Sequence, residues 1–249
     1  MKKLLGRLLG KGVSAVRPTC TAILAAAGSS QRMGGENKLL LPLDGMPVLA
    51  HTLRAVDAAQ SVDEIVIAAR EEDLLTYAEL CKTYGIRKPV KVVVGGATRE
   101  ESVLRAALEA RADAKLLAVQ DGARPLVTPE LFDAVVLRAA VCAAAAPAVP
   151  VHDTMKLARD RRVTETPDRS MLFAVQTPQV FDAGLLKAAL QSALTEHAAL
   201  TDDCSAVERL GKAVYLTDGD GENIKITTPL DLIVAEAILR RREEREAEE

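Results

Sequence analysis

Short apolar runs alternate along this chain with amphipathic stretches. The apolar runs predict strands over residues 21–27, 64–69, 91–94, 116–120, 143–149 and 213–216. In the amphipathic stretches, apolar residues recur every three or four positions, which predicts helices over residues 47–60, 74–84, 100–110, 129–141, 183–194, 203–210 and 230–241. This alternation predicts an α/β protein, in which a mostly parallel, twisted sheet is flanked by helices on both faces.

The alternation stops between about residues 150 and 181. That segment is polar, contains Pro167 and Pro178, and has strand-like pieces only at 151–157 and 172–175. We therefore predict an arm within a single domain over residues 20–240. Residues 1–19 form an N-terminal extension in this interpretation, and residues 241–249 a charged, solvated helix end. The spacing of Ser205 and Glu208 fits a capping box at a helix entry.

Three loops with small or polar residues follow predicted strands. They begin at Gly28, at Gly95–Gly96 and at Asp121–Gly122. In open α/β sheets, ligands bind beyond the carboxyl ends of the strands. We therefore expect these loops, which are far apart in the sequence, to meet at one crevice.

The first of these loops is the most informative. The small residues 25–30 are followed by Arg32 and Lys38, but neither the GxGxxG nor the GxxxxGK[ST] pattern is present. Small residues alone also fit an ordinary tight turn. Two cations beside backbone N–H groups favour a loop that wraps a triphosphate and neutralises the charge that develops during nucleotidyl transfer.

The other polar loops are less specific by themselves. Gly95–Gly96 fits either a close approach of backbone to ligand or a turn into a helix. Asp121 beside Arg124 fits a ribose or magnesium contact as well as a structural ion pair. Near the far end of the chain, Lys225 lies between two isoleucines in a predicted short strand, where a cation needs an anionic partner or an open cleft.

Composition excludes several classes of protein. Aromatic residues make up 2% and Trp is absent, so the chain has too few aromatic side chains to stack on nucleic-acid bases. A net charge of −3 argues against a broad nucleic-acid-binding surface. The 4 cysteines form no CxxC motif, which predicts reduced thiols in a cytoplasmic protein and no structural zinc. Basic residues interrupt the apolar start of the chain, so we expect neither a signal peptide nor a membrane span.

Taken in order, these motifs resemble the 2-C-methyl-D-erythritol 4-phosphate cytidylyltransferase family of the non-mevalonate isoprenoid pathway. The opening loop alone also resembles sugar-nucleotide and molybdopterin nucleotidyltransferases, so the ordered set carries the specificity. The matching stretches are 25–38, 41–49, 95–103, 121–125, 153–156, 176–179, 201–208 and 223–229.

The resemblance implies a Rossmann-like nucleotidyltransferase whose β-arm clasps a second subunit in a homodimer. It implies that CMP passes from CTP to 2-C-methyl-D-erythritol 4-phosphate, giving 4-diphosphocytidyl-2-C-methyl-D-erythritol and pyrophosphate. Magnesium is then bound mainly through the CTP phosphates, and no dedicated protein metal site is expected.

The resemblance also implies roles for particular residues. Arg32 and Lys38 match transition-state stabilisers, and Arg169 and Lys225 match residues that position methylerythritol phosphate; we expect these four to be catalytic. Thr154 and Thr177 match further substrate-binding positions. The expected CTP-binding residues are Ala25, Ala26, Ala27, Gly28, Ser29, Gly96, Ser102, Asp121, Gly122 and Arg124.

Two alternatives remain open at this point. A ribitol-5-phosphate cytidylyltransferase has the same fold and chemistry, although the stretch 201–208 favours methylerythritol phosphate. A non-catalytic nucleotide-binding protein is disfavoured by the presence of all four candidate cations.

Overall fold

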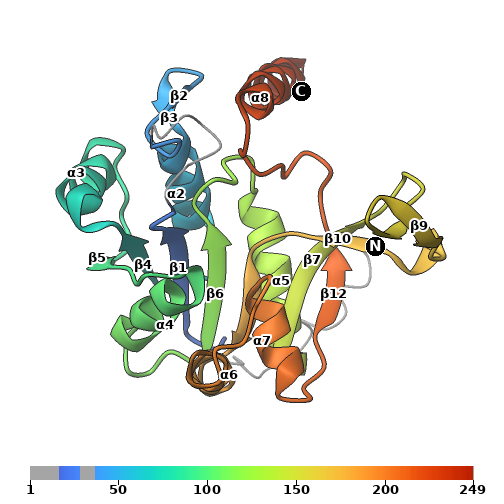
Figure 1. The fold of residues 1–249 in the computed structure, drawn as a ribbon. Helices are drawn as coiled ribbons and strands as arrows, with labels where there is room; N and C mark the ends of the chain where they lie inside the picture. Colours follow the sequence, from blue (N-terminus) through green and yellow to red (C-terminus); the bar gives the residue numbers. More distant parts are fainter. Residues whose placement is uncertain (1–16, 29–36, 249) are drawn as a thin grey trace, which may run out of the picture.

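An eight-stranded sheet forms the centre of the computed structural model, which describes residues 17–28 and 37–248 (Figure 1). Its strand order is β10-β7-β11-β6-β1-β4-β5, and β12 pairs with β7. The strands are β1 (Cys20–Ala26), β4 (Glu64–Ala69), β5 (Val90–Val94), β6 (Leu116–Asp121), β7 (Ala144–Pro150), β10 (Phe173–Val175), β11 (Gln179–Asp182) and β12 (Tyr215–Asp218).

Most neighbouring strands are parallel, as the alternation of elements predicts. β1 lies between β4 and β6 and is parallel to both, β5 is parallel to β4, and β12 is parallel to β7. The exceptions are β10 and β11, which are antiparallel to their partners. Both belong to the segment that the sequence assigns to the arm, so part of that segment joins the main sheet.

Helices cover both faces of the sheet. They are α2 (Val48–Ala58), α3 (Leu74–Thr83), α4 (Arg99–Glu109), α5 (Pro129–Cys142), α6 (Ala183–Thr195), α7 (Asp203–Arg209) and α8 (Pro229–Glu248). Single 3-10 turns occur at Glu71–Asp73 and Arg169–Met171. A small ladder of β2 (Pro42–Leu43) and β3 (Met46–Pro47) precedes α2, which begins directly after Pro47.

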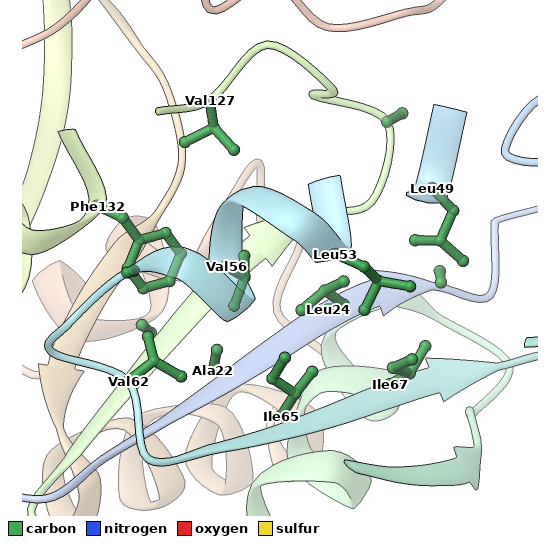
Figure 2. Packing of buried hydrophobic residues seen from close by; sticks show 14 of the residues in the cluster. Ala22, Leu24, Leu49, Leu53, Val56, Val62, Ile65, Ile67, Val127 and Phe132 are labelled. Carbon is green, nitrogen blue, oxygen red and sulfur yellow. The ribbon is translucent and has the colours of Figure 1, made fainter. Parts of the chain in front are cut away.

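The side chains of each central strand alternate between two hydrophobic cores. Leu24 of β1 and Ile65 of β4 pack with α2, α3 and α5, whereas Ile23 and Val66 pack on the opposite face with α4, α6 and α7. Figure 2 shows the first core, where Leu24 lies among side chains of α2 and β4. Because successive strand residues point to opposite faces, strands buried on both sides read as continuous apolar runs.

The arm extends from the sheet beyond β7 and β12 (Figure 1). It contains the two-stranded ladder of β8 (Leu157–Arg159) and β9 (Arg162–Glu165), whose turn residues Asp160 and Arg161 both have positive φ, as a tight hairpin requires. The predicted strand over 151–157 is wrong, since only its last residue is in a strand. The second predicted piece corresponds to β10, which pairs with β7.

The predicted capping box is displaced by one turn. Asp202, not Ser205, caps α7: its carboxylate accepts a hydrogen bond from Ser205 N at 2.9 Å, and Ser205 Oγ accepts one from Asp202 N at 3.3 Å. A carboxylate at the N-cap position, directly before a helix, satisfies free N–H groups of the first turn as well as a hydroxyl does. Within residues 17–28 and 37–248, the helices are too short or too polar to cross a bilayer.

Candidate active site

The carboxyl end of β1 opens into a cavity of about 330 Å³. Ala25, Ala26, Ala27 and Gly28 form part of its wall, and their small side chains leave room between β1 and the neighbouring loops. The rest of the wall comes from Lys38, Leu39, Gly96, Ala97, Thr98, Arg99, Ser102, Asp121, Ala123 and Lys225. The convergence of the three loops on one crevice is therefore confirmed.

The loop before α4 is folded tightly against the helix that follows it. Gly96 N donates to Ser102 Oγ at 2.9 Å, and Glu101 N donates to the capping hydroxyl of Thr98 at 3.2 Å. A Cβ on Gly96 would lie 2.3 Å from Cγ of Glu101, so a larger residue would displace the loop. The backbone of this loop therefore lies at the wall of the cavity, where a bound nucleotide can approach it closely because Gly96 has no side chain.

Lys38 and Lys225 meet at this cavity although they are far apart in the sequence. Lys38 Nζ donates to the carbonyl oxygen of Ile226 at 2.9 Å, and Lys225 Nζ lies 2.8 Å from a carboxylate oxygen of Asp121. The structure thus brings together two of the four predicted catalytic residues. Arg32 and Ser29 lie outside the described residues.

Lys225 is not in a strand, contrary to the sequence prediction. The buried residues around it are Asn223 and Ile226, three positions apart, so the alternation of a strand is absent. Ile226 N donates a hydrogen bond to Ala123 O, which lies in a loop and not in a neighbouring strand. The apolar residues on either side of Lys225 therefore anchor a loop, and the ammonium group faces the cavity.

Asp121 faces three cations. Besides Lys225, its carboxylate lies 3.6 Å from Arg99 Nη2 and 3.5 Å from Arg124 Nε. Burial alone would raise the pKa of Asp121, but the charges of Lys225, Arg99 and Arg124 outweigh it and hold that pKa below its ordinary value. Asp121 therefore stays ionised and neutralises part of the positive charge before an anionic ligand arrives.

Arg99 makes a second buried ion pair that the sequence prediction missed. Its Nη2 lies 2.8 Å from the carboxylate of Asp203, which has no exposed surface. Burial raises the pKa of the Asp203 carboxyl against the opposing effect of Arg99. Both residues lie in stretches that the resemblance includes, but nothing in the sequence indicates that α4 and α7 meet at this point.

A smaller, more polar cavity of about 170 Å³ adjoins the first and shares Arg99, Asp121 and Lys225 with it. Thr177 and Arg124 line this second cavity. Thr177 Oγ1 accepts a hydrogen bond from Asp121 N at 3.1 Å, and Arg124 Nη1 donates to Asn223 O at 2.7 Å. Two ligands could thus lie on either side of Lys225, which is the arrangement that a group transfer between them needs.

Of the predicted site residues that the structure describes, Gly122, Thr154 and Arg169 line neither cavity of their own chain. Gly122 lies beneath the crevice, where its N–H donates to Ala25 O at 3.2 Å and its carbonyl accepts from Thr52 at 3.0 Å. Thr154 and Arg169 are exposed on the arm, and Arg169 donates to His152 O. Another cavity, of about 500 Å³, lies between α3 and β5; it has mostly apolar walls, and its lining includes none of the predicted residues.

Residues 20–241 match the family model of 2-C-methyl-D-erythritol 4-phosphate cytidylyltransferase. The chain belongs to this family. A 2-C-methyl-D-erythritol 4-phosphate cytidylyltransferase of Bacillus cereus is 43% identical over 220 residues, which are 88% of this chain and 97% of the relative. That of Halalkalibacterium halodurans is 43% identical over 226 residues, covering 90% and 99% of the two chains.

Solved structures of this cytidylyltransferase family have the same fold. The 4-diphosphocytidyl-2C-methyl-D-erythritol synthase of Anaerococcus prevotii superposes with a TM-score of 0.82 at 30% identity, over 90% of this chain and 96% of that one. The cytidylyltransferase of Thermus thermophilus gives a TM-score of 0.72 at 30% identity, over 89% and 99%. The predicted Rossmann-like nucleotidyltransferase fold and family are thus confirmed.

Proposed function

We propose that this chain transfers CMP from CTP to 2-C-methyl-D-erythritol 4-phosphate in the crevice formed by the two adjoining cavities. A phosphate oxygen of the acceptor attacks the α-phosphorus of CTP. The bond from that phosphorus to the bridging oxygen of the β-phosphate breaks, and pyrophosphate leaves with the bonding electron pair. The observation that carries this proposal is that Lys38 and Lys225 line one cavity, where Lys38 donates to Ile226 O and Lys225 pairs with Asp121.

The chain's residues supply alignment and charge in this mechanism. The nucleophile is already an ionised phosphate, so a general base is not required. The larger cavity, with its wall of small residues and the Gly96 loop, suits the nucleoside part of CTP. The smaller cavity suits the acceptor, and Lys225, which lines both, can hold the two anions together.

Magnesium fits this site mainly through the phosphates of CTP. Among the residues that the structure describes, Asp121 is the carboxylate that lines the larger cavity, and three cations already surround it, so it offers little free coordination. When bound, the metal would neutralise phosphate charge and orient the leaving pyrophosphate.

We further propose that the arm mediates a homodimer. The arm and the adjoining strand β10 expose apolar side chains, including Leu157, Val163, Met171 and Phe173 at 52%, 53%, 75% and 45%. Since Thr154 and Arg169 line neither cavity of their own chain, a role in substrate binding requires that they reach the crevice of a second copy. Sedimentation of the wild type and of Val163→Asp tests this: we expect a dimer that the substitution weakens, and a wild-type monomer would contradict it.

One assay tests the reaction itself. Purified protein, CTP and magnesium are incubated with each acceptor phosphate, and pyrophosphate is measured. We expect release with methylerythritol phosphate. Release only with ribitol 5-phosphate would assign the chain to the alternative reaction, and CTP binding without release from either acceptor would indicate a non-catalytic nucleotide-binding protein.

A further inference from the structure

The loop that carries Lys225 lies outside the sheet and depends on side chains for its position. It runs over residues 219–226, from the end of β12 to the start of the segment before α8. Its backbone is fixed near its two ends, where Gly219 N donates to Ala148 O and Ile226 N donates to Ala123 O. Asn223 holds the middle from one side, by donating to Thr177 O at 3.0 Å.

The C-terminal helix holds the same loop from the other side, through Glu222. Arg242 Nε donates to one carboxylate oxygen of Glu222 at 2.8 Å, and Arg241 donates to the other. Arg245 lies 4.0 Å from Glu222, and Arg242 is also 3.6 Å from Asp220. The hydrogen bond from Arg242, reinforced by both arginine charges, keeps the pKa of Glu222 below its ordinary value.

Arg242 reaches a second loop as well. Its Nη1 donates to the carbonyl oxygen of Leu126 at 3.1 Å, in the loop that carries Arg124 and follows directly after Asp121, the last residue of β6. One guanidinium therefore joins the two loops whose charged residues form the crevice. The Arg242 side chain is 23% exposed and that of Glu222 is 22% exposed, so solvent screens the pair less than a surface ion pair.

We propose that Arg242, acting with Glu222, is a positioning residue for cytidylyl transfer. Its guanidinium fixes the 219–226 loop against the loop after β6 and so holds the ammonium group of Lys225 where the two cavities meet. Arg242 touches neither cavity, so its effect passes through the backbone of the two loops. This inference rests on the proposed function.

The geometry requires arginine at this position. A guanidinium is planar and presents five donors, so it can bind a carboxylate and a carbonyl in different directions at once. The ammonium group of a lysine is a point charge and cannot reproduce both contacts. Arg242→Lys therefore keeps the charge of the helix while it removes the link between the loops.

The test compares steady-state kinetics of the wild type, Arg242→Ala, Arg242→Lys and a matched control, Arg240→Ala. Arg240 lies on the same helix, is 71% exposed and pairs with Glu236 of its own helix. We expect kcat to fall about tenfold in Arg242→Ala and to stay well below wild type in Arg242→Lys, because small displacements of a catalytic group cost rate steeply. The KM for CTP should change less than threefold, and Arg240→Ala should match the wild type.

CTP titration by calorimetry gives the folded, binding-competent fraction, so a loss of folded protein cannot mimic the effect. If Arg242→Ala does not fold, Glu222→Ala removes the carboxylate that Arg242 binds on the 219–226 loop, and we expect kcat to fall in the same way. A kcat within twofold of wild type in the folded variant, or an equal loss in Arg240→Ala, would overturn the inference. A wild-type protein without pyrophosphate release would instead overturn the proposed function.

Discussion

Asp121 is the residue on which the electrostatics of the crevice depend. Its carboxylate is 9% exposed and faces Lys225, Arg99 and Arg124. Removal of one partner from such a cluster leaves uncompensated charge in a poorly solvated place. The same arrangement prepares the crevice for anions, because the cations are already fixed when the ligand binds.

Asp121→Asn should lower the free energy of unfolding at pH 7 by on the order of 1–3 kcal/mol, because Lys225 and Arg124 lose their carboxylate partner and Arg99 keeps only Asp203. The pKa of Asp121 is lowered in the folded state, so its stabilising contribution is complete above its ordinary value of 3.8 and is lost as the pH falls through the folded value. Urea unfolding at several pH values should show a constant difference between wild type and variant above about pH 5, and a shrinking one below pH 4. A difference that grows on acidification would contradict this assignment.

Lys38→Ala should slow turnover by about 10²–10³-fold, the usual effect of removing a group that stabilises transition-state charge. CTP affinity should change far less, because the cavity wall of small residues and the Gly96 loop is unaltered. Steady-state kinetics and calorimetry separate the two quantities. Lys115→Ala, at an exposed residue before β6 at the opposite edge of the sheet, is the control; unchanged turnover in Lys38→Ala would refute the role.

Among the elements, helix entries show how local sequence fixes local structure. Thr98, Thr128 and Asp202 each cap the helix that follows by accepting a backbone N–H in its first turn. Two of these caps also line the crevice: Thr98 lines the larger cavity, and Asp202 lines the smaller one. The entry of α5 is different, since Thr128 and the following Pro129 serve the helix alone.

Thr128→Ala should therefore cost about 1 kcal/mol of folding free energy and leave the kinetic constants unchanged. The hydroxyl of Thr128 accepts from Leu131 N at 3.2 Å, and alanine leaves that donor without its partner. Thr128→Ser keeps the acceptor and should be near wild type. Chemical denaturation of the three proteins checks the order, and equal losses in both variants would show that the cap does not contribute.

For the whole molecule, the sheet between two cores provides the rigid platform for the crevice. β1 is central, and its side chains contribute to both cores, so its carboxyl end has little freedom to move. Leu24 has no exposed surface and lies beside Leu53, Val56 and Ile65 (Figure 2). A substitution that leaves a cavity at Leu24 should therefore lower the stability of the whole fold.

Leu24→Ala should lower the free energy of unfolding by about 2–5 kcal/mol, from lost burial and the cavity that remains. Leu108→Ala is the matched control, since Leu108 is 63% exposed on α4 and should cost less than about 0.5 kcal/mol. Thermal or urea unfolding measures both. Similar losses in the two variants would contradict the placement of the core.

The sequence by itself determined the order and type of most elements, the parallel core of the sheet and the loops that form the crevice. These follow from local physics: apolar periodicity, helix caps, and the rule that the carboxyl ends of parallel strands face the same edge. The family resemblance added the chemistry expected of Lys38, Lys225 and Asp121.

Only the tertiary structure decided which distant groups meet. Four features join segments that are far apart in the chain. They are the pairing of β10 and β11 with the main sheet, the loop conformation around Lys225, the ion pair of Arg99 with Asp203 and the hydrogen bond from Arg242 to Leu126 O. Each depends on a partner that no local pattern specifies, because a polar side chain is buried at low cost only where folding supplies its counterpart. The periodicity of the sequence predicts which faces are buried, but the complete fold selects these partners.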